Sequence, residues 1–201
     1  MTLAELLARL LGDPLEVTAV TFGILSVWLS TRQHIASWPT ALVNVSLFFV
    51  IFARSRLYAD MGLQVIYFGL SVYGWYEWKF GGAGRTELPV SRATRRDAMV
   101  LLPLGIGGTA LLGTLLARYT NAALPFVDSA TTVTSLLAQW MMTRKRLENW
   151  LVWIAVDVVY VAMFLSRGLE LTAINYAVYL GLATLGYIHW RRSIAARATA
   201  V

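Results

Sequence analysis

The segment WLSTRQHIASW, residues 28–38, returns later in the chain as WMMTRKRLENW, residues 140–150. The two segments share their first and last tryptophans and the Thr-Arg pair between them, each displaced by 112 positions. Tryptophan is a rare residue, so this agreement indicates an internal repeat rather than a shared apolar composition. The same offset relates further pairs without a gap: Phe52 and Phe164, Leu57 and Leu169, Tyr67 and Tyr179, Gly74 and Gly186, and Trp78 and Trp190.

The composition around this repeat is that of a membrane protein. Of the 201 residues, 58% are hydrophobic and 14% are charged, and the mean hydropathy is +0.61. A soluble domain carries about 25% charged residues, and a helix of about 20 apolar residues crosses a bilayer. We therefore predict an all-α integral membrane protein with seven transmembrane helices. The predicted spans are residues 15–31, 37–53, 60–78, 98–117, 124–142, 149–166 and 171–190.

In the repeat, the first three predicted spans correspond in sequence to the last three. The fourth span between them makes both halves enter the membrane in the same sense, which gives a parallel 3+1+3 arrangement. Parallel halves leave a central path between them, so this architecture favours a small-solute carrier; a membrane scaffold without a path is the alternative. The predicted organisation is an amphipathic N-terminal helix (1–14), a first three-helix repeat (15–78), a loop and linker helix (79–123), a second three-helix repeat (124–190) and a cytoplasmic tail (191–201).

Basic residues distribute unevenly between the two sides of the seven-span arrangement. Five of the 17 fall on one side and twelve on the other. Because lysine and arginine are retained on the cytoplasmic face, the N-terminus is predicted outside and the C-terminus inside. The richer side holds Arg32, Lys79, Arg85, Arg92, Arg95, Arg96, Arg144, Lys145, Arg146, Arg191, Arg192 and Arg197.

Several function classes lack their residues in this chain. There is no cysteine, which excludes disulfides and thiolate chemistry. The net charge is +6, and the basic residues lie between apolar segments. Their positions indicate membrane topology rather than nucleic-acid binding. His34 lies in a predicted inner loop and His189 at the inner end of a predicted span, and no nucleophile and base share one depth. We therefore expect no enzyme activity, no cofactor and no metal.

Polar side chains at membrane depth are candidates for function because they are costly there. Asn44 lies about halfway along the second predicted span, and Asp157 lies about halfway along the sixth. The repeat brings Asn44 within one position of Asp157, so the two should approach the midplane from opposite halves. No lysine or arginine is available at that depth to neutralise Asp157. For Asn44, a hydrogen bond that only locks helix packing is the alternative.

Aromatic residues accompany Asp157. Trp150, Trp153, Asp157 and Tyr160 are spaced by three, four and three residues, which puts them on one face of a helix. Two indoles, a phenol and a carboxylate on one inward face suit a flat cationic ring, although ordinary core packing gives the same spacing. Three other tryptophans stand at predicted span ends, where aromatic interfacial belts are expected: Trp38, Trp78 and Trp190.

The runs LYADMGLQVIYFGLSVYGWYEW (57–78) and DSATTVTSLLAQWMMTRKRLENWLVWIAVDV (128–158) resemble the PnuC-type bacterial vitamin transporters. The best-known members of that family take up nicotinamide riboside. The resemblance implies a fold similar to that of the SWEET sugar carriers and facilitated diffusion without ATP or an obligatory coupling ion. It further implies trapping of the vitamin by cytoplasmic phosphorylation, and a homotrimer in the bacterial inner membrane.

The resemblance also supplies candidate substrate-binding residues. Gln64 matches the glutamine of the LQ motif, and Asn149, Trp150 and Trp153 match an ENWxxW run. Position 157 departs from the W-x-x-x-N pattern of nicotinamide riboside carriers. A carboxylate there suits nicotinamide riboside or thiamine, which both carry a cationic ring, and fits a sugar less well. The predicted set is Asn44, Gln64, Tyr67, Asn149, Trp150, Trp153, Asp157 and Tyr160.

Overall fold

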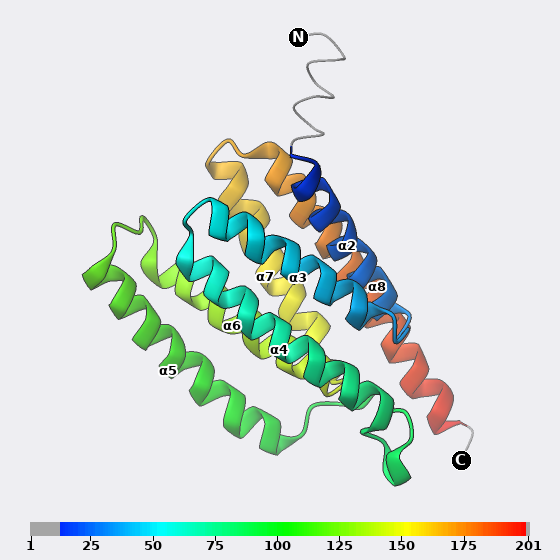
Figure 1. Cartoon of the computed structure of the whole chain (residues 1–201). Coiled ribbons are helices and arrows are strands. Elements are labelled where there is room, and N and C mark those ends of the chain that lie inside the picture. Colours follow the sequence, from blue (N-terminus) through cyan, green and yellow to red (C-terminus); the bar gives the residue numbers. More distant parts are fainter. Residues whose placement is uncertain (1–12, 200–201) are drawn as a thin grey trace.

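The computed structural model describes residues 13–199, and the regular elements of this part of the chain are all helices, as predicted. Two groups of three helices are separated in the sequence by a further helix, which lies at the edge of the molecule (Figure 1). The first group is α2 (Pro14–Thr31), α3 (Ser37–Arg54) and α4 (Tyr58–Phe80). The second group is α6 (Pro125–Thr143), α7 (Asn149–Ser166) and α8 (Glu170–Ala198). Between them come the short 3₁₀ helix η1 (Ala83–Arg85) and α5 (Arg95–Tyr119).

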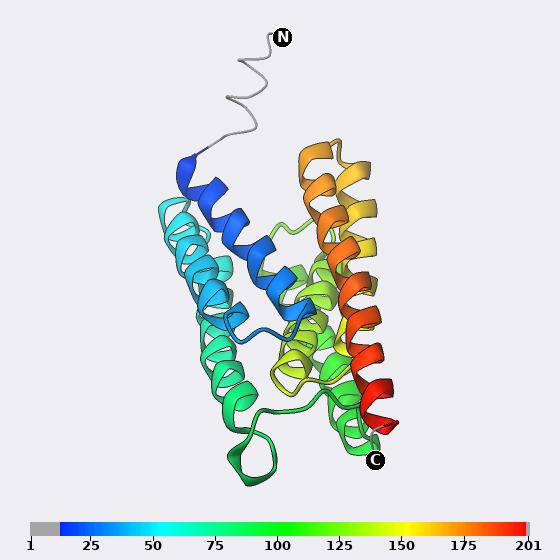
Figure 2. The same ribbon diagram turned by 90° about the vertical axis from the view of Figure 1, so that its right-hand side faces the viewer.

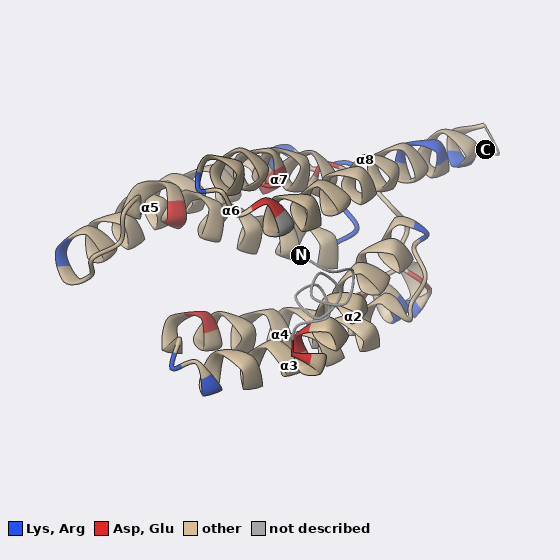
Figure 3. Ribbon diagram, turned by 90° about the horizontal axis from the view of Figure 1, so that it is seen from above, with Lys and Arg blue, Asp and Glu red and all other residues tan. Residues whose placement is uncertain are grey.

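The two groups form separate layers that meet along two pairs of helices (Figures 2 and 3). Within each group the middle helix packs against both of its neighbours: α3 against α2 and α4, and α7 against α6 and α8. Across the layers α2 contacts α8 and α4 contacts α6, while α5 packs on α6. The first helix of each group therefore contacts the last helix of the other.

Each predicted span coincides with one of the helices α2 to α8. By length and apolar composition, α2, α3, α5 and α7 are able to cross a membrane. The more polar composition of α6 has a structural reason, because its Ser129, Thr131 and Ser135 are buried against protein. Each of these hydroxyls donates to a backbone carbonyl three or four residues earlier in its own helix.

Local sequence signals begin and end the helices. Asp13 caps α2 by accepting a hydrogen bond from the Leu15 amide, and Pro14 is the first residue of that helix. Thr94 and Asp97 form a capping box at the start of α5. The predicted amphipathic helix over residues 1–14 otherwise lies outside the described residues. The predicted tail beginning at residue 191 continues α8 as far as Ala198.

The turns of the two groups correspond at the offset of 112 residues. Gln33, after α2, has a φ of 57°, and Lys145, after α6, has a φ of 46°. Arg56, after α3, has a φ of 58°, and Gly168, after α7, has a φ of 69°. These left-handed residues follow the last turn of a helix in each case, which is where such a conformation reverses the chain.

The segments predicted to lie inside meet at one end of the molecule. The Ser91 amide donates to the Lys145 carbonyl (3.0 Å), and the Leu147 amide donates to the Ser91 carbonyl (2.8 Å). Arg197, near the end of α8, donates to the carbonyl of Val90 (2.9 Å). The α4–α5 connection thus lies across the α6–α7 loop and is held to the end of α8.

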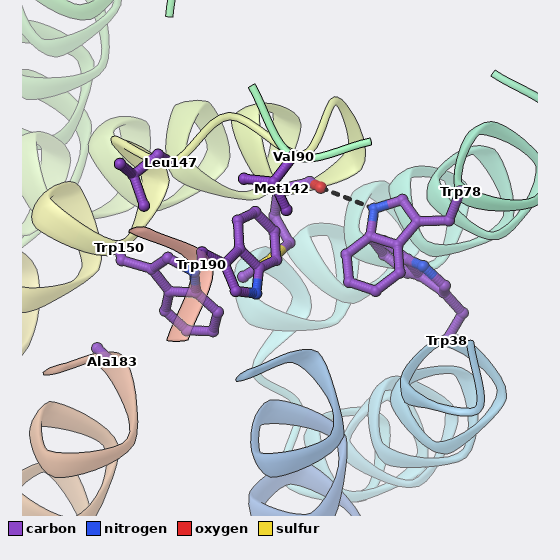
Figure 4. Close-up of a cluster of buried hydrophobic side chains, with 8 residues drawn as sticks. All are labelled: Trp38, Trp78, Val90, Met142, Leu147, Trp150, Ala183 and Trp190. Carbon is purple, nitrogen blue, oxygen red and sulfur yellow. Dashed lines mark hydrogen bonds between the residues drawn. The ribbon is translucent and has the colours of Figure 1, made fainter. Parts of the chain in front are cut away.

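A cluster of tryptophans fills the interior near this end (Figure 4). Trp38, Trp78, Trp150 and Trp190 are at most 2% exposed. Trp78 packs edge-on against Trp38 (5.2 Å between ring centroids), and Trp190 packs edge-on against Trp150 (5.4 Å). The prediction that Trp38, Trp78 and Trp190 belong to interfacial belts is therefore wrong. These residues stand at helix ends, but their rings are buried in the cluster.

Crossed hydrogen bonds hold this tryptophan cluster together. The Trp78 indole N–H donates to the Met142 carbonyl of the second group (3.0 Å), and the Trp190 indole N–H donates to the Ser30 carbonyl of the first (2.9 Å). Met142 and Ser30 lie in the last turns of α6 and α2, and their carbonyls also accept from the Lys145 and Gln33 amides (3.0 Å each). Each indole thus adds a second hydrogen bond to a carbonyl at a helix end across the interface.

Candidate functional site

A cavity of about 290 Å³ lies between the two groups of helices. Residues of α2, α3, α4, α6, α7 and α8 line it, and α5 contributes none of its described residues to the lining. Trp38, Met142, Trp150 and Ala183 belong both to this lining and to the tryptophan cluster, so the cluster forms one wall of the cavity. The cavity therefore ends where the two groups are joined by the crossed hydrogen bonds.

Six of the eight predicted site residues line this cavity: Asn44, Gln64, Tyr67, Trp150, Trp153 and Asp157. They come from α3, α4 and α7, which shows that residues far apart in the sequence meet in one space. Asn149 and Tyr160 are outside the lining.

Asp157 is the charged residue of the lining. Its side chain is 3% exposed, and among residues 13–199 it has neither a hydrogen bond nor a salt bridge to protein. An ionised carboxylate in such a place is unfavourable unless a positive charge or hydrogen-bond donors compensate it. A carboxyl group in this place either takes up a proton or is compensated by a positive group that enters the cavity.

Asn44 and Tyr67 each make one contact that helps to build the cavity wall. The Asn44 side-chain amide donates to the Ala19 carbonyl (2.7 Å), which ties α3 to α2. The Tyr67 hydroxyl and the Ser135 hydroxyl are 2.7 Å apart, which joins α4 to α6 across the two groups. The packing hydrogen bond considered for Asn44 is thus present, and the same side chain also lines the cavity.

Asn149 and Tyr160 lie on either side of the cavity-lining part of α7. The Asn149 side-chain amide is buried and donates to the Arg146 carbonyl in the α6–α7 loop. It precedes Asp157 by eight residues, or about 12 Å along a helix. Tyr160 packs against Tyr176, with 4.6 Å between ring centroids, and Tyr176 itself lines the cavity. Tyr160 therefore supports an aromatic wall from behind.

The further lining residues that the structure identified include Gly23, Tyr176 and Tyr179. A sequence signal existed for Tyr179, because it is the counterpart of Tyr67 at the offset of 112 residues. Trp38 has the same relation to Trp150. In the described part of the chain, the indole N–H groups of Trp38 and Trp150 have no acceptor. Both nitrogens are buried, so each is a polar atom enclosed by the cluster without a hydrogen bond.

Lys145 lies beneath the tryptophan cluster, in the loop after α6. Its ammonium nitrogen is 4.4 Å from the centroid of the Trp78 ring, and the side chain is 5% exposed. Burial lowers the pKa of Lys145 to about 8, from an ordinary value of 10.5. The buried Lys145 ammonium thus lies outside the cavity, against the Trp78 ring of the tryptophan cluster that forms one cavity wall.

The lining suits binding of an organic molecule better than catalysis or metal binding. Within residues 13–199, no group of three histidine, aspartate or glutamate side chains is placed to hold a metal ion. Aromatic rings, amides and one carboxylate are groups that bind a ligand without changing it.

Comparison with known proteins agrees with this arrangement. PnuC of Escherichia coli, a nicotinamide riboside transporter, is 29% identical over 89% of this chain and 85% of its own length. The riboflavin/roseoflavin transporter RibM of Streptomyces davaonensis is 25% identical, over 84% of this chain and 80% of its own. The crystal structure of the vitamin B3 transporter PnuC superposes with a TM-score of 0.72 at 25% identity, covering 96% of this chain and 86% of that one.

The family model described as nicotinamide mononucleotide transporter matches residues 13–192. That match includes α2 to α7 and most of α8, and hence every residue that lines the cavity. The resemblance to PnuC-type transporters seen in the sequence is confirmed. The chain is a multi-pass membrane transporter, not an enzyme, and it belongs to the nicotinamide mononucleotide transporter family that includes PnuC.

Proposed function

We propose that this protein takes up nicotinamide riboside, a flat cationic nucleoside-like vitamin, by facilitated diffusion. The observation that carries the proposal is the buried Asp157 carboxylate, which faces the cavity without a protein partner among the described residues. The pyridinium ring of nicotinamide riboside has a fixed positive charge. A ligand of that kind compensates the charge of the carboxylate. Water in a cavity with apolar walls compensates this charge less well.

The rest of the lining supports a ligand with a flat ring and polar substituents. Trp150 and Trp153 precede Asp157 on the same helix and line the same cavity, which favours stacking of the ring beside the carboxylate. Gln64 and Asn44 supply amide groups that suit the carboxamide and hydroxyls of the vitamin. The volume of about 290 Å³ is at the small end of ordinary ligand pockets.

A transport path follows from the position of the cavity between the two groups of helices. The proposed arrangement is seven spans in a parallel 3+1+3 repeat, with the N-terminus outside and the C-terminus inside the bacterial inner membrane. Rocking of one group against the other would expose the cavity to each side in turn. Release inside requires the crossed bonds of Trp78 and Trp190 to break. Phosphorylation of the vitamin in the cytoplasm then keeps the uptake gradient inward.

Thiamine is the second candidate, and Asp157 is again the reason. Its thiazolium ring is also a flat cation, and position 157 carries a carboxylate where the pattern implied by the resemblance has asparagine. The two vitamins differ in their hydrogen-bonding groups, so the same cavity need not accept both.

The experiment is a parallel titration of the detergent-purified protein with nicotinamide riboside, thiamine and uridine. Tryptophan fluorescence and calorimetry report binding, since Trp150 and Trp153 line the cavity. We expect nicotinamide riboside to quench the fluorescence and release or absorb heat, and uridine, which is neutral, to do neither at the same concentration. Binding of thiamine alone would overturn the assignment in favour of vitamin B1. Binding of neither cation would overturn both candidates.

The proposed assembly is a homotrimer, with lipid around its outer surface. Light scattering on the same purified material, corrected for bound detergent, measures the protein mass. A mass near three times 22.3 kDa is the expected result. A mass near 22.3 kDa would contradict it.

A further inference from the structure

The two tyrosines at corresponding positions of the repeat have different surroundings. Tyr67, in α4, points its hydroxyl at Ser135 of α6, 2.7 Å away. Tyr179, in α8, lies 112 positions later, and the counterpart of Ser135 in α2 is Gly23. The residue opposite Tyr67 is therefore a serine, whereas the residue opposite Tyr179 is a glycine, which has no side chain.

The missing side chain of Gly23 leaves a notch in α2 that two polar side chains occupy. A Cβ atom at this position would be 2.7 Å from the Tyr179 hydroxyl and 2.8 Å from the Asn44 side-chain nitrogen. Both groups therefore approach the helix backbone more closely than a larger residue would allow. Gly23, Asn44 and Tyr179 all line the cavity, so these two polar groups lie at its wall.

The hydrogen-bonding state of the two tyrosines differs in the same way. The Tyr67 hydroxyl is engaged with Ser135, whereas the Tyr179 hydroxyl has no hydrogen bond to protein within residues 13–199. A tyrosine hydroxyl donates one hydrogen bond and accepts others, and an asparagine amide also offers both kinds of group. Neither is charged. This pair suits alcohol hydroxyls rather than the cationic ring, for which Asp157 is the compensating group.

We propose that Tyr179, in the notch left by Gly23, binds the sugar hydroxyls of the ligand. The inference rests on the proposed function and deepens it, because it divides the cavity into a ring side at Asp157 and a hydroxyl side at Tyr179. Tyr67 is then the structural member of the pair and Tyr179 the binding member. The specificity of the carrier for a riboside over the free base follows from this hydroxyl side.

The test compares Tyr179→Phe with Tyr187→Phe, a variant of the same helix at a position outside the cavity lining. Nicotinamide riboside and its 2′,3′-dideoxy analogue are titrated against each. We expect Tyr179→Phe to weaken binding of the riboside about five- to tenfold, the usual range for one lost hydrogen bond. The dideoxy analogue should bind this variant and the natural protein within about twofold. Tyr187→Phe should bind both ligands as the natural protein does.

Two results would overturn the inference. One is unchanged riboside affinity in Tyr179→Phe; the other is an equal loss for the riboside and the dideoxy analogue, which would mean a general effect on the cavity. If the natural protein binds neither ligand, the proposed function fails together with this inference. Failure of the inference alone shows as riboside binding that is indifferent to Tyr179.

Gly23→Ser provides a second, opposite test, since it copies Ser135 into the notch. The added side chain would be within 3 Å of the Tyr179 hydroxyl and the Asn44 amide, so both groups would have to move from the positions proposed to bind the ligand. We expect riboside affinity to fall more than tenfold, with the unfolding temperature followed in the same samples to confirm that the variant is folded. A folded Gly23→Ser protein with natural riboside affinity would contradict the notch as a binding site.

Discussion

At the tryptophan cluster, the two groups of helices use the same residues in the same way. Trp78 of the first group bonds to Met142 of the second, and Trp190 of the second bonds to Ser30 of the first. Both the donors and the acceptors differ in position by 112 residues. At the cavity the agreement is only partial: Tyr67 and Tyr179 correspond and both line it, whereas other positions differ. Asp157 corresponds to Val45, and Gly23 corresponds to Ser135.

The difference separates two tasks of one repeated unit. In the proposed transport cycle, the contacts that break and re-form between the groups are the duplicated ones, so both groups contribute equally to them. In the proposed binding mode, the charged end and the hydroxyl end of the ligand meet residues that differ between the groups. The comparison predicts equal effects for paired changes at the cluster and unequal effects for changes at the cavity.

The largest expected effect is the loss of either cluster tryptophan that makes a crossed bond. Trp78→Ala and Trp190→Ala should each lower the free energy of unfolding by about 3–5 kcal/mol, because a fully buried ring and its hydrogen bond are removed. Denaturant titration in detergent measures this. Trp75→Ala, on α4 but 40% exposed, is the matched control and should cost much less. A large loss for only one of the two cluster tryptophans would contradict their equivalence.

A smaller effect is expected from Lys145, which corresponds to Gln33 in the first group. Burial lowers the pKa of Lys145 to about 8, so the unfolded chain binds more protons than the folded one between pH 8 and 10.5. The free energy of unfolding contributed by this group should therefore rise over that pH range, by at most about 3 kcal/mol, and stay level below it.

Lys145→Gln copies the residue of the first group and isolates this contribution. The difference between its stability curve and that of the natural protein, measured from pH 7 to 11, removes the titration of all other groups. We expect the variant to be the more stable at pH 7 and the two curves to converge toward pH 10.5. A constant difference across the range would show that the folded-state pKa of Lys145 is not lowered.

The smallest expected effects come from the two glycines under the tryptophan rings. A Cβ at Gly74 would be 2.2 Å from the Trp38 ring, and one at Gly186 would be 2.5 Å from the Trp150 ring. Alanine at either position should lower the free energy of unfolding by about 1–2 kcal/mol after its better helix propensity is counted. Gly62→Ala and Gly181→Ala, where nothing lies within 4 Å, are the controls on the same two helices. Losses as large in the controls would show that the close approach does not matter.

Much of the fold could be predicted from the sequence, because membrane helices and repeats leave strong signals. The span predicted over residues 149–166 is α7, and the span predicted over 15–31 differs from α2 by one residue. The continuation of α8 to Ala198 was missed, since its last turns carry arginines that resemble a terminal tail. Apolar length marks where a helix crosses a membrane, but it does not mark where a polar helix stops.

The site was predicted less completely, because residue type does not reveal which way a helix end faces. Trp38 and Trp190 have the positions of interfacial residues, and only packing between the groups shows that they are buried. Asn149 shares the motif of Trp150 and Trp153, yet its side chain donates to the Arg146 carbonyl in the loop before α7. Gly23 has no side chain to draw attention in a sequence. Its importance appears only when the surroundings of Tyr67 and Tyr179 are compared.

The most direct test of the account is the affinity of the natural protein and of Asp157→Asn for nicotinamide riboside and for its reduced form, which has nearly the same shape without the positive charge. If Asp157 recognises the cationic ring, the substitution should weaken binding of the oxidised vitamin about tenfold or more and change binding of the reduced form about twofold at most. Equal weakening of both forms, or no weakening of either, would contradict charge recognition in the cavity.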